Sequence, residues 1–336
     1  MSDLIRPVRL SEQGVLSDAL VESWRLHGYA LVDNLLPERL IQEAVAQLQA
    51  VYDGEAGDAQ RAKRDFGGFQ FPFVDSSLEA LNRLTLHSVI LEAASRLLAT
   101  DAILLTQSDA WAKYGVARNG SPYDNQDQRM HIDGWNHTLA APPDWNHPVS
   151  VAMIVYLSTE QDCGGGTALV ARSGESDAAY KDFVNLQTPG GRCDLPWMND
   201  RATAEKWIEE NNLDVAQFRR SLYERERRVS FTPGTVLLYR HDVWHRGTPL
   251  NENSQRLVVN LSFRRKDAPY WLQWNPGWAQ SMYSTDQTLE KLIARASVEQ
   301  RNVLGFPPPG DVYWNDKTKE HVRLRYEHFG IDLSMY

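Results

Sequence analysis

Short apolar or alternating runs between residues 102 and 265 are the feature that most limits what this chain can fold into. The runs are bounded by Gly, Pro, Asn and Asp, which are the residues that turns between strands favour. The predicted strands are AILLTQSDAWAKYG from residue 102, VSVAMIVYLS (149–158), GTALVA (166–171), RVSFT (228–232), TVLLYR (235–240) and QRLVVNLSFR (255–264). Many short strands with turns between them indicate a β-sandwich or a barrel.

Helical patterns flank and interrupt this series of strands. Residues 174–226 combine a loop containing Gly, Pro and Asn with two helical stretches, and strands resume directly afterwards. We therefore predict an insertion of about 174–226 and not a separate domain. The whole chain, 1–336, is predicted to be one domain with a β core of about 102–265 and a C-terminal helical and aromatic extension, 266–336. Apolar periodicity predicts further helices after Pro37, at 76–99, 285–300 and 316–327, and YALVDNL (29–35) is a predicted strand.

Composition narrows the functional classes. The sequence has no 18-residue apolar run and no signal-peptide pattern at its start, so we expect neither a membrane span nor secretion, and a cytoplasmic location. Neither Cys163 nor Cys193 lies in a CxxC pair, so a metal site would use His and carboxylate ligands. A net charge of −9 argues against nucleic-acid binding, and the basic run 219–228, which is interleaved with Glu, is predicted to be a solvated helix face. The oligomeric state is not predicted.

The stretch MHIDGWNH (130–137) holds the first candidate ligands. His131 and Asp133 are two residues apart, so in an extended segment both side chains point to the same side. Together with one distant histidine they would form the 2-His-1-carboxylate triad that holds Fe(II) and leaves positions open for a co-substrate and O2. An HxD pair is common in sequences, so the pair alone does not establish a metal site.

The segment 232–263 supplies a possible second half of the site. A turn and an apolar strand lead to His245, and Arg256 follows eleven positions later on the next predicted strand. An arginine fork can grip the distal carboxylate of 2-oxoglutarate while the keto-acid end of that molecule chelates iron. A ligand pair of His241 and His245 is an alternative, but only His245 has an arginine eleven residues downstream.

Taken in order, these motifs resemble the phytanoyl-CoA dioxygenase family of Fe(II)/2-oxoglutarate oxygenases. The likeness covers most of residues 15–265 and includes ESWRLHGYALVDNLL (22–36) and the turn GGGTALVARSGE (164–175). The resemblance implies a double-stranded β-helix, which is a cupin-like jelly roll, flanked by N-terminal and C-terminal helices. It also implies that iron is bound by His131, Asp133 and His245, and 2-oxoglutarate by Arg256.

Two departures from the family pattern concern loops near the site. Many members end the glycine turn with a PGSH-like sequence, where this chain has ARSGE (171–175). The family often has a hydroxyl residue two positions after the distal histidine, where this chain has Gly247. Thr248, the next residue, is predicted to take over that hydroxyl's contact with the co-substrate.

Alternation along QSDAWAK (107–113) places four side chains on one face of a strand, and the resemblance places that strand beside the co-substrate. We predict that Gln107 and Lys113 line the cavity and contact 2-oxoglutarate. Asp109 would repel a dicarboxylate, so it is expected to pair with Lys113 or to face the substrate.

Trp135 and Asn136 directly follow the HxD pair and are the predicted substrate contacts, with ordinary packing as the alternative. The insertion and the aromatic stretch PYWLQWNPGWAQ (269–280) are expected to cover the cavity and to favour an apolar or ring-bearing small molecule.

The predicted activity is a 2-oxoglutarate-dependent dioxygenase that hydroxylates an unactivated C–H bond and releases succinate and CO2. Desaturation or cyclisation stays open, whereas halogenation is disfavoured, because related halogenases have a small residue in place of Asp133. The alternatives are a cupin-like metal enzyme or metal-binding protein that does not use 2-oxoglutarate, and a β-sandwich binding protein with no redox role.

Overall fold

The computed structural model describes residues 4–12, 14–52, 69–73, 76–115, 127–133, 145–181, 197–268, 288–303 and 305–336. The chain divides into two compact units. The first contains Met1–Gln128, Pro148–Ala171 and Glu226–Lys266, and the second contains Arg129–His147, Arg172–Arg225 and Asp267–Tyr336. Every described strand belongs to the first unit.

The strands of the first unit form two sheets, which confirms the predicted strand-rich region. The seven-stranded sheet has the order β1 (Val8–Arg9), β2 (Tyr29–Asp33), β8 (Val236–Tyr239), β5 (Ser150–Tyr156), β10 (Gln255–Arg265), β4 (Ile103–Tyr114) and β3 (Phe69–Gln70). The three-stranded sheet has the order β7 (Arg227–Arg228), β6 (Thr167–Leu169) and β9 (His245–Gly247). All neighbouring strands are antiparallel except the pair β1 and β2.

One predicted strand is shorter than expected. The run 228–232 forms a strand only at Arg227–Arg228. Beyond this point Val229 forms an isolated bridge with Ile5, in which the Ile5 N–H donates to the Arg228 carbonyl and the Ser230 N–H donates to the Ile5 carbonyl. The Val229 N–H donates to the Thr167 carbonyl at 3.0 Å.

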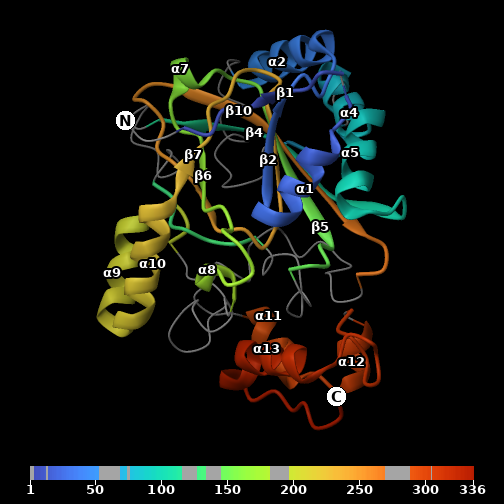
Figure 1. Ribbon diagram of the computed structural model, residues 1–336, viewed down its shortest axis with the longest axis vertical. Coiled ribbons are helices and arrows are strands. Elements are labelled where there is room, and N and C mark those ends of the chain that lie inside the picture. Colours follow the sequence, from blue (N-terminus) through green and yellow to red (C-terminus); the bar gives the residue numbers. More distant parts are fainter. Residues whose placement is uncertain are drawn as a thin grey trace. The chain divides into compact units, whose positions relative to one another are not determined.

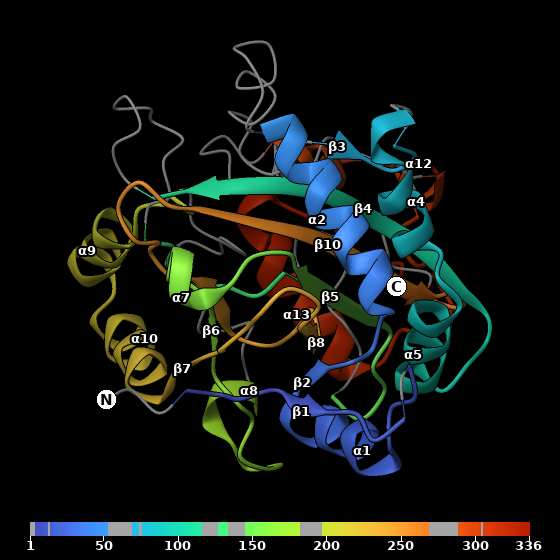
Figure 2. The ribbon, with the colours of Figure 1, turned by 90° about the horizontal axis from the view of Figure 1, so that it is seen from above.

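Helices cover one face of the seven-stranded sheet, as Figure 1 and Figure 2 show for α2, α4 and α5. The helices of this unit are α1 (Asp18–His27), α2 (Glu38–Tyr52), the 3-10 turn η1 (Ser76–Leu78), α4 (Glu79–Thr85), α5 (Ser88–Leu98) and α7 (Glu160–Cys163). The prediction of a single helix over 76–99 is wrong in one respect, because the helical structure is interrupted between α4 and α5. His87 has an extended backbone, and its ring Nδ1 accepts a hydrogen bond from the Val89 N–H, so it caps a new helix.

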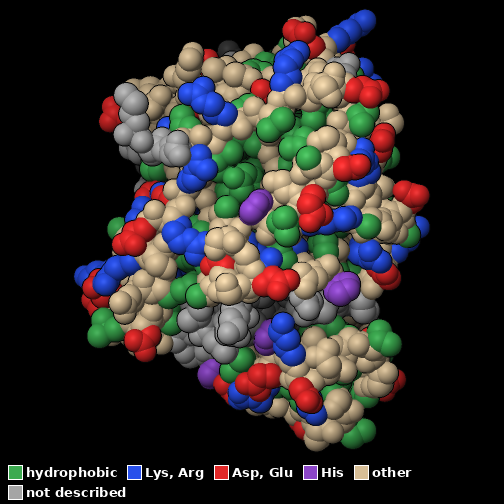
Figure 3. All heavy atoms as spheres, viewed as in Figure 1, with side chains coloured by type: hydrophobic (Ala, Val, Ile, Leu, Met, Phe, Trp, Pro, Cys, Tyr) green, Lys and Arg blue, Asp and Glu red, His purple; other side chains and the backbone are tan. Residues whose placement is uncertain are grey.

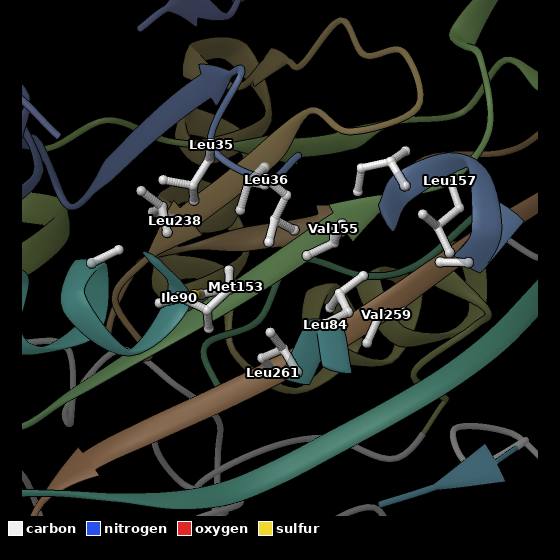
Figure 4. Close-up of a cluster of buried hydrophobic side chains, with 14 of the residues drawn as sticks. Leu35, Leu36, Leu84, Ile90, Met153, Val155, Leu157, Leu238, Val259 and Leu261 are labelled. Atoms are coloured by element: carbon white, nitrogen blue, oxygen red, sulfur yellow. The ribbon is translucent and has the colours of Figure 1, made fainter. Parts of the chain in front are cut away.

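The main hydrophobic core lies between these helices and the sheet. Figure 4 shows Met153 and Val155 of β5 packed with Val259 and Leu261 of β10 and with side chains from α4 and α5. These residues are separated by two positions along their strands, so they share one face of the sheet. Burial of this face against the helices is the main stabilising contribution to the unit.

The opposite face of the seven-stranded sheet contacts the three-stranded sheet. The hydroxyl of Tyr156 on β5 donates to Thr167 Oγ1 on β6 at 2.8 Å. The ring centroids of Tyr239 on β8 and His245 on β9 are 4.8 Å apart. Consequently the two sheets have a polar and aromatic layer between them, and the candidate site residues of β4, β9 and β10 belong to it.

The described elements of the second unit are helical. They are α8 (Ala178–Lys181), α9 (Arg201–Asn211), α10 (Leu213–Arg225), α11 (Thr288–Arg295), α12 (Val298–Val303), α13 (Asp316–Tyr326) and the 3-10 turn η2 (Glu327–Phe329). Two helices in the insertion and a last helix near 316–327 were predicted, and both predictions are confirmed. The single helix predicted over 285–300 is two helices, because the Ser297 hydroxyl accepts from the Gln300 N–H and starts α12.

The basic run 219–228 is only in part the solvated helix face that its composition predicts. Arg220 is exposed and pairs with Glu209, whereas the Arg219 side chain is 3% exposed and pairs with Glu205. The prediction fails at Arg219 because this residue faces α9 and is screened from water there.

Charged side chains of both signs are interspersed on the face shown in Figure 3. Ion pairs join charged side chains of the first unit, such as those of Arg83 with Glu43 and Glu79. No described helix has both the length and the apolar character that a membrane crossing requires.

Candidate metal centre

The segment that carries the HxD pair is attached at its start to strand β9. The Gln128 N–H donates to the Gly247 carbonyl at 3.2 Å, and the Gly247 N–H donates to Gln128 Oε1 at 2.6 Å. Arg246 of the same strand donates to Asp127 and to Glu226. These bonds join the two residues Asp127 and Gln128 to the strand that begins with His245.

His131, Asp133 and His245 form one group of possible ligands. One ligand atom from each lies within 4.8 Å of the others, and all three side chains are buried. His131 Nε2 and Asp133 Oδ1 are 3.6 Å apart. Metal–ligand bonds of about 2.0–2.2 Å put two ligand atoms roughly 3–4 Å apart, so the His131–Asp133 pair has the spacing that one ion bridges. The limit of 4.8 Å for the whole group is wider than two such bonds span, so the ligand atoms would have to draw closer around an ion.

Both histidines are held in the tautomer that a metal needs. His131 Nδ1 lies 3.0 Å from the Arg129 carbonyl, and His245 Nδ1 lies 2.9 Å from the Val243 carbonyl. A carbonyl only accepts hydrogen bonds, so Nδ1 of each ring carries a proton, and the neutral form of each ring then has its lone pair on Nε2. Two such imidazoles with one carboxylate are the donor set of non-haem Fe(II) sites, and the residues present therefore fit that ion.

His241, the alternative ligand, is placed differently. It is buried, and its Nε2 lies 3.2 Å from Ser262 Oγ. The described group of possible metal ligands contains His245 and does not contain His241.

Arg256 is a buried cation without a carboxylate partner among the described residues. Arg256 lies on β10, and only 4% of the residue is exposed to solvent. One terminal nitrogen of its guanidinium donates to the Gly165 carbonyl. Its Nε has no hydrogen-bond partner in the described part of the chain. Burial lowers the pKa of Arg256, and the groups that oppose this effect are Tyr156 and Cys163, neither of which is a carboxylate. An orphaned guanidinium of this kind suits an acidic ligand.

The strand register brings the other predicted co-substrate residues to the same face. Lys113 lies directly opposite Arg256, and Gln107 directly opposite Ser262. Lys113 is buried, and its Nζ is 5.5 Å from the centroid of the Trp111 ring. The Gln107 amide donates to Asp109 Oδ2 at 2.7 Å and accepts from the Ser262 hydroxyl at 3.2 Å, so both ends of this amide are engaged within the sheet.

Gly247 is a glycine because other side chains fill the space beside it. A Cβ atom at this position would lie 2.6 Å from Gln128 Oε1 and 2.8 Å from Lys113 Nζ. Gln128 and Lys113 thus occupy the space that a side chain at residue 247 would need. The contact of Gln128 with residue 247 was not predicted from the sequence. The glycine at that position was the available sign, since glycine suits a site where neighbouring side chains leave no room for a Cβ atom.

A side chain at residue 247 is expected to destabilise the protein. Gly247→Ala should lower the free energy of unfolding by about 1–3 kcal/mol, because the new methyl group overlaps the Gln128 amide. Thermal or urea unfolding of the metal-free protein measures this cost. In a Gln128→Ala background the cost of Gly247→Ala should be smaller, and equal costs in both backgrounds would show that the overlap is not the cause.

The remaining predicted residues are placed as follows. The Thr248 hydroxyl donates to the Gly166 carbonyl at 2.8 Å, so its proton is already engaged. Trp135 and Asn136 lie outside the described residues, as does the stretch 269–280. Their predicted contacts with substrate stay predictions.

Comparisons with known proteins give structural similarity only. No protein-family model matches the sequence, and none of the curated proteins matches it. EctD from S. alaskensis in its apoform is 14% identical, with 82% of this chain and 90% of that chain covered and a TM-score of 0.49. HygX from Streptomyces hygroscopicus with nickel and 2-oxoglutarate bound is 13% identical, with 82% and 94% covered and a TM-score of 0.48. The non-heme alpha ketoglutarate dependent carbocyclase SnoK from nogalamycin biosynthesis is 16% identical, with 76% and 86% covered and a TM-score of 0.48.

Proposed function

We propose that this chain is a non-haem Fe(II), 2-oxoglutarate-dependent oxygenase that acts on a small molecule. The observation that carries the proposal is a buried group of two histidines and a carboxylate in a chain that also buries an arginine without a described carboxylate partner. Each feature by itself also occurs in proteins that lack this activity. Together they match the two requirements of this chemistry, which are an iron site and a cation for a dicarboxylate.

The fold that we propose for this function is the double-stranded β-helix, with residues 1–336 acting as one oxygenase domain. Support comes from the three-stranded sheet, which contacts the seven-stranded sheet on the face opposite the helices. The helical insertion interrupts the strand series between β6 and β7 and leaves the pairing of these two strands intact.

The proposed roles follow from the chemistry of each side chain. His131, Asp133 and His245 would hold Fe(II), and the Arg256 fork would hold the distal carboxylate of 2-oxoglutarate. Lys113, directly across the strand pair from Arg256, would add a second positive charge. Gln107 and Thr248 would contribute weaker contacts, because the Gln107 amide and the Thr248 hydroxyl already bond within the protein. Bound Fe(II) with 2-oxoglutarate and O2 supplies the oxidation of a substrate C–H bond, with release of succinate and CO2.

Hydroxylation of an unactivated C–H bond is the reaction that we propose. As an iron ligand, Asp133 would occupy the position that a halide needs in a halogenase, which argues against halogenation. Trp135 and Asn136 are the proposed substrate contacts.

Two titrations on the purified protein, followed by a substrate screen, test this function. We expect Mn(II), as a redox-silent substitute for Fe(II), to bind the metal-free protein, and 2-oxoglutarate to bind only after the metal. At a concentration 100 times its Kd, 2-oxoglutarate should then stabilise the protein by about 2.7 kcal/mol in thermal unfolding. A metabolite screen with Fe(II) and O2 should next identify a substrate that couples succinate release to a product heavier by one oxygen.

The outcomes separate the proposal from its rivals. Metal binding without any response to 2-oxoglutarate would favour a cupin-like metal protein. Absence of both responses would favour a β-sandwich binding protein.

A further inference from the structure

Hydrogen bonds hold both polar groups of the peptide that joins Arg129 to Met130, just before His131. In the peptide that joins Arg129 to Met130, the carbonyl accepts from His131 Nδ1 at 3.0 Å, and the N–H donates to the Tyr223 hydroxyl at 2.9 Å. A single peptide plane therefore connects the ring of the proposed metal ligand to a side chain of α10. The N–H of Arg129 is bonded as well, to the Met198 carbonyl at 3.0 Å.

The carbonyl of Met130, the next residue in the chain, is also bound by a side chain of α10. Arg219 Nη2 donates to the Met130 carbonyl at 2.8 Å. Glu205 of α9 orients both α10 side chains, since it accepts from Arg219 Nε at 2.9 Å and from the Tyr223 hydroxyl at 2.6 Å. The Tyr223 hydroxyl gives its one proton to Glu205, so its lone pair accepts the Met130 N–H, and the direction of every bond is fixed.

Electrostatics keep this Glu205–Arg219–Tyr223 network in one charge state. Burial raises the pKa of the Glu205 carboxyl, but the charge of Arg219 and the hydrogen bonds from Arg219 and Tyr223 outweigh it, and the pKa is lowered overall. Burial raises the pKa of Tyr223 to about 12. At neutral pH the carboxylate is ionised and the phenol is protonated, as the bonds require.

A second ion pair joins the same two helices, and it differs from this network in the exposure of its side chains. Glu209 and Arg220 also join α9 to α10, but their side chains are 56% and 57% exposed. An exposed pair of this kind contributes little to stability. The Arg219 side chain is 3% exposed, and its network ends on the backbone beside His131.

We propose that the α9–α10 insertion is a positioning element of the metal centre, in which Glu205, Arg219 and Tyr223 fix the backbone that aims His131 Nε2. This inference rests on the proposed function in that it takes His131 as a metal ligand. The inference goes beyond the proposed function because it gives the insertion a role at the metal centre. Groups that hydrogen-bond to a ligating histidine orient the ring and raise its basicity, and here one peptide group passes that effect from Tyr223 to the ring.

Tyr223→Phe is the sharpest test, because it removes one oxygen and leaves the ring, over which the Arg201 guanidinium lies at 3.8 Å. Glu205→Gln removes the charge that orients Arg219, and Glu209→Gln is the matched control on the same helix. Co(II) binding to the metal-free protein is measured by calorimetry and by the visible absorption of the bound ion. We expect Tyr223→Phe and Glu205→Gln to bind Co(II) on the order of tenfold more weakly, with an altered spectrum, and Glu209→Gln to match the wild type.

The possible results distinguish the two proposals. If the wild type binds Co(II) and a folded Tyr223→Phe variant binds it with the same affinity and spectrum, the positioning role is wrong and the network only joins helices. If the wild type binds no Co(II), the metal centre itself is wrong. If Glu205→Gln unfolds at the assay temperature, Tyr223→Phe decides alone, because it removes no charge.

Discussion

Replacing Arg256 by methionine is expected to abolish the response to 2-oxoglutarate and to leave metal binding intact. The guanidinium would provide the fork for the distal carboxylate, and loss of one partner from a buried charge pair costs about 2–5 kcal/mol. The Kd for 2-oxoglutarate should therefore rise by roughly 30-fold or more, up to several thousand-fold, at one tenfold step per 1.4 kcal/mol. Calorimetric titration of 2-oxoglutarate into the Mn(II)-loaded wild type and variant measures this change.

The same substitution should not destabilise the ligand-free protein. Arg256 is buried with one carbonyl contact and an unpartnered Nε among the described residues, so its desolvation is poorly compensated in the absence of an acidic ligand. We expect Arg256→Met to unfold at the wild-type temperature or above it.

Arg240→Met is the matched control for Arg256→Met. Arg240 is equally buried but holds Asp242 through two hydrogen bonds of 2.8 and 2.6 Å, so its loss should cost about 1–3 kcal/mol and leave the Kd for 2-oxoglutarate unchanged. A wild-type Kd in Arg256→Met would remove this residue from the co-substrate site and favour a metal protein that does not use 2-oxoglutarate.

The strands could be predicted because their periodicity is local. The run predicted at 255–264 is the strand Gln255–Arg265, and alternation along 107–113 correctly placed Gln107 and Lys113 on the face that Arg256 shares. The helix boundaries were harder to predict. His87 and Ser297 each start a new helix through one capping hydrogen bond, and apolar periodicity continues across such a cap.

The candidate ligands were found from spacing, but the groups that hold them were not. His131 and Asp133 stand two residues apart, which is a local pattern, whereas Gln128 matters through its bonds to residue 247. Glu205 and Glu209 show the limit most clearly. Both are acidic residues on α9 with an arginine partner on α10, and only the three-dimensional structure shows which pair reaches the backbone beside His131.

His245→Ala and His241→Ala remove the same imidazole from buried positions four residues apart, and we expect opposite effects at the metal centre. His245 belongs to the group of possible ligands that contains His131 and Asp133, so its loss leaves two ligands. Metal affinity should fall by more than about 100-fold, which exceeds the usual effect of losing a hydrogen bond behind a ligand, and turnover of 2-oxoglutarate should cease.

His241→Ala should instead affect stability and not the metal. The His241 ring bonds to the Ser262 hydroxyl, and removing it leaves that hydroxyl with the Gln107 amide, for a cost of about 1–3 kcal/mol in unfolding. Calorimetry with Mn(II) and thermal unfolding of both variants separate the two effects. If His241→Ala lost the metal and His245→Ala kept it, the distal ligand would be His241, and the spacing of eleven residues to Arg256 would no longer identify the site.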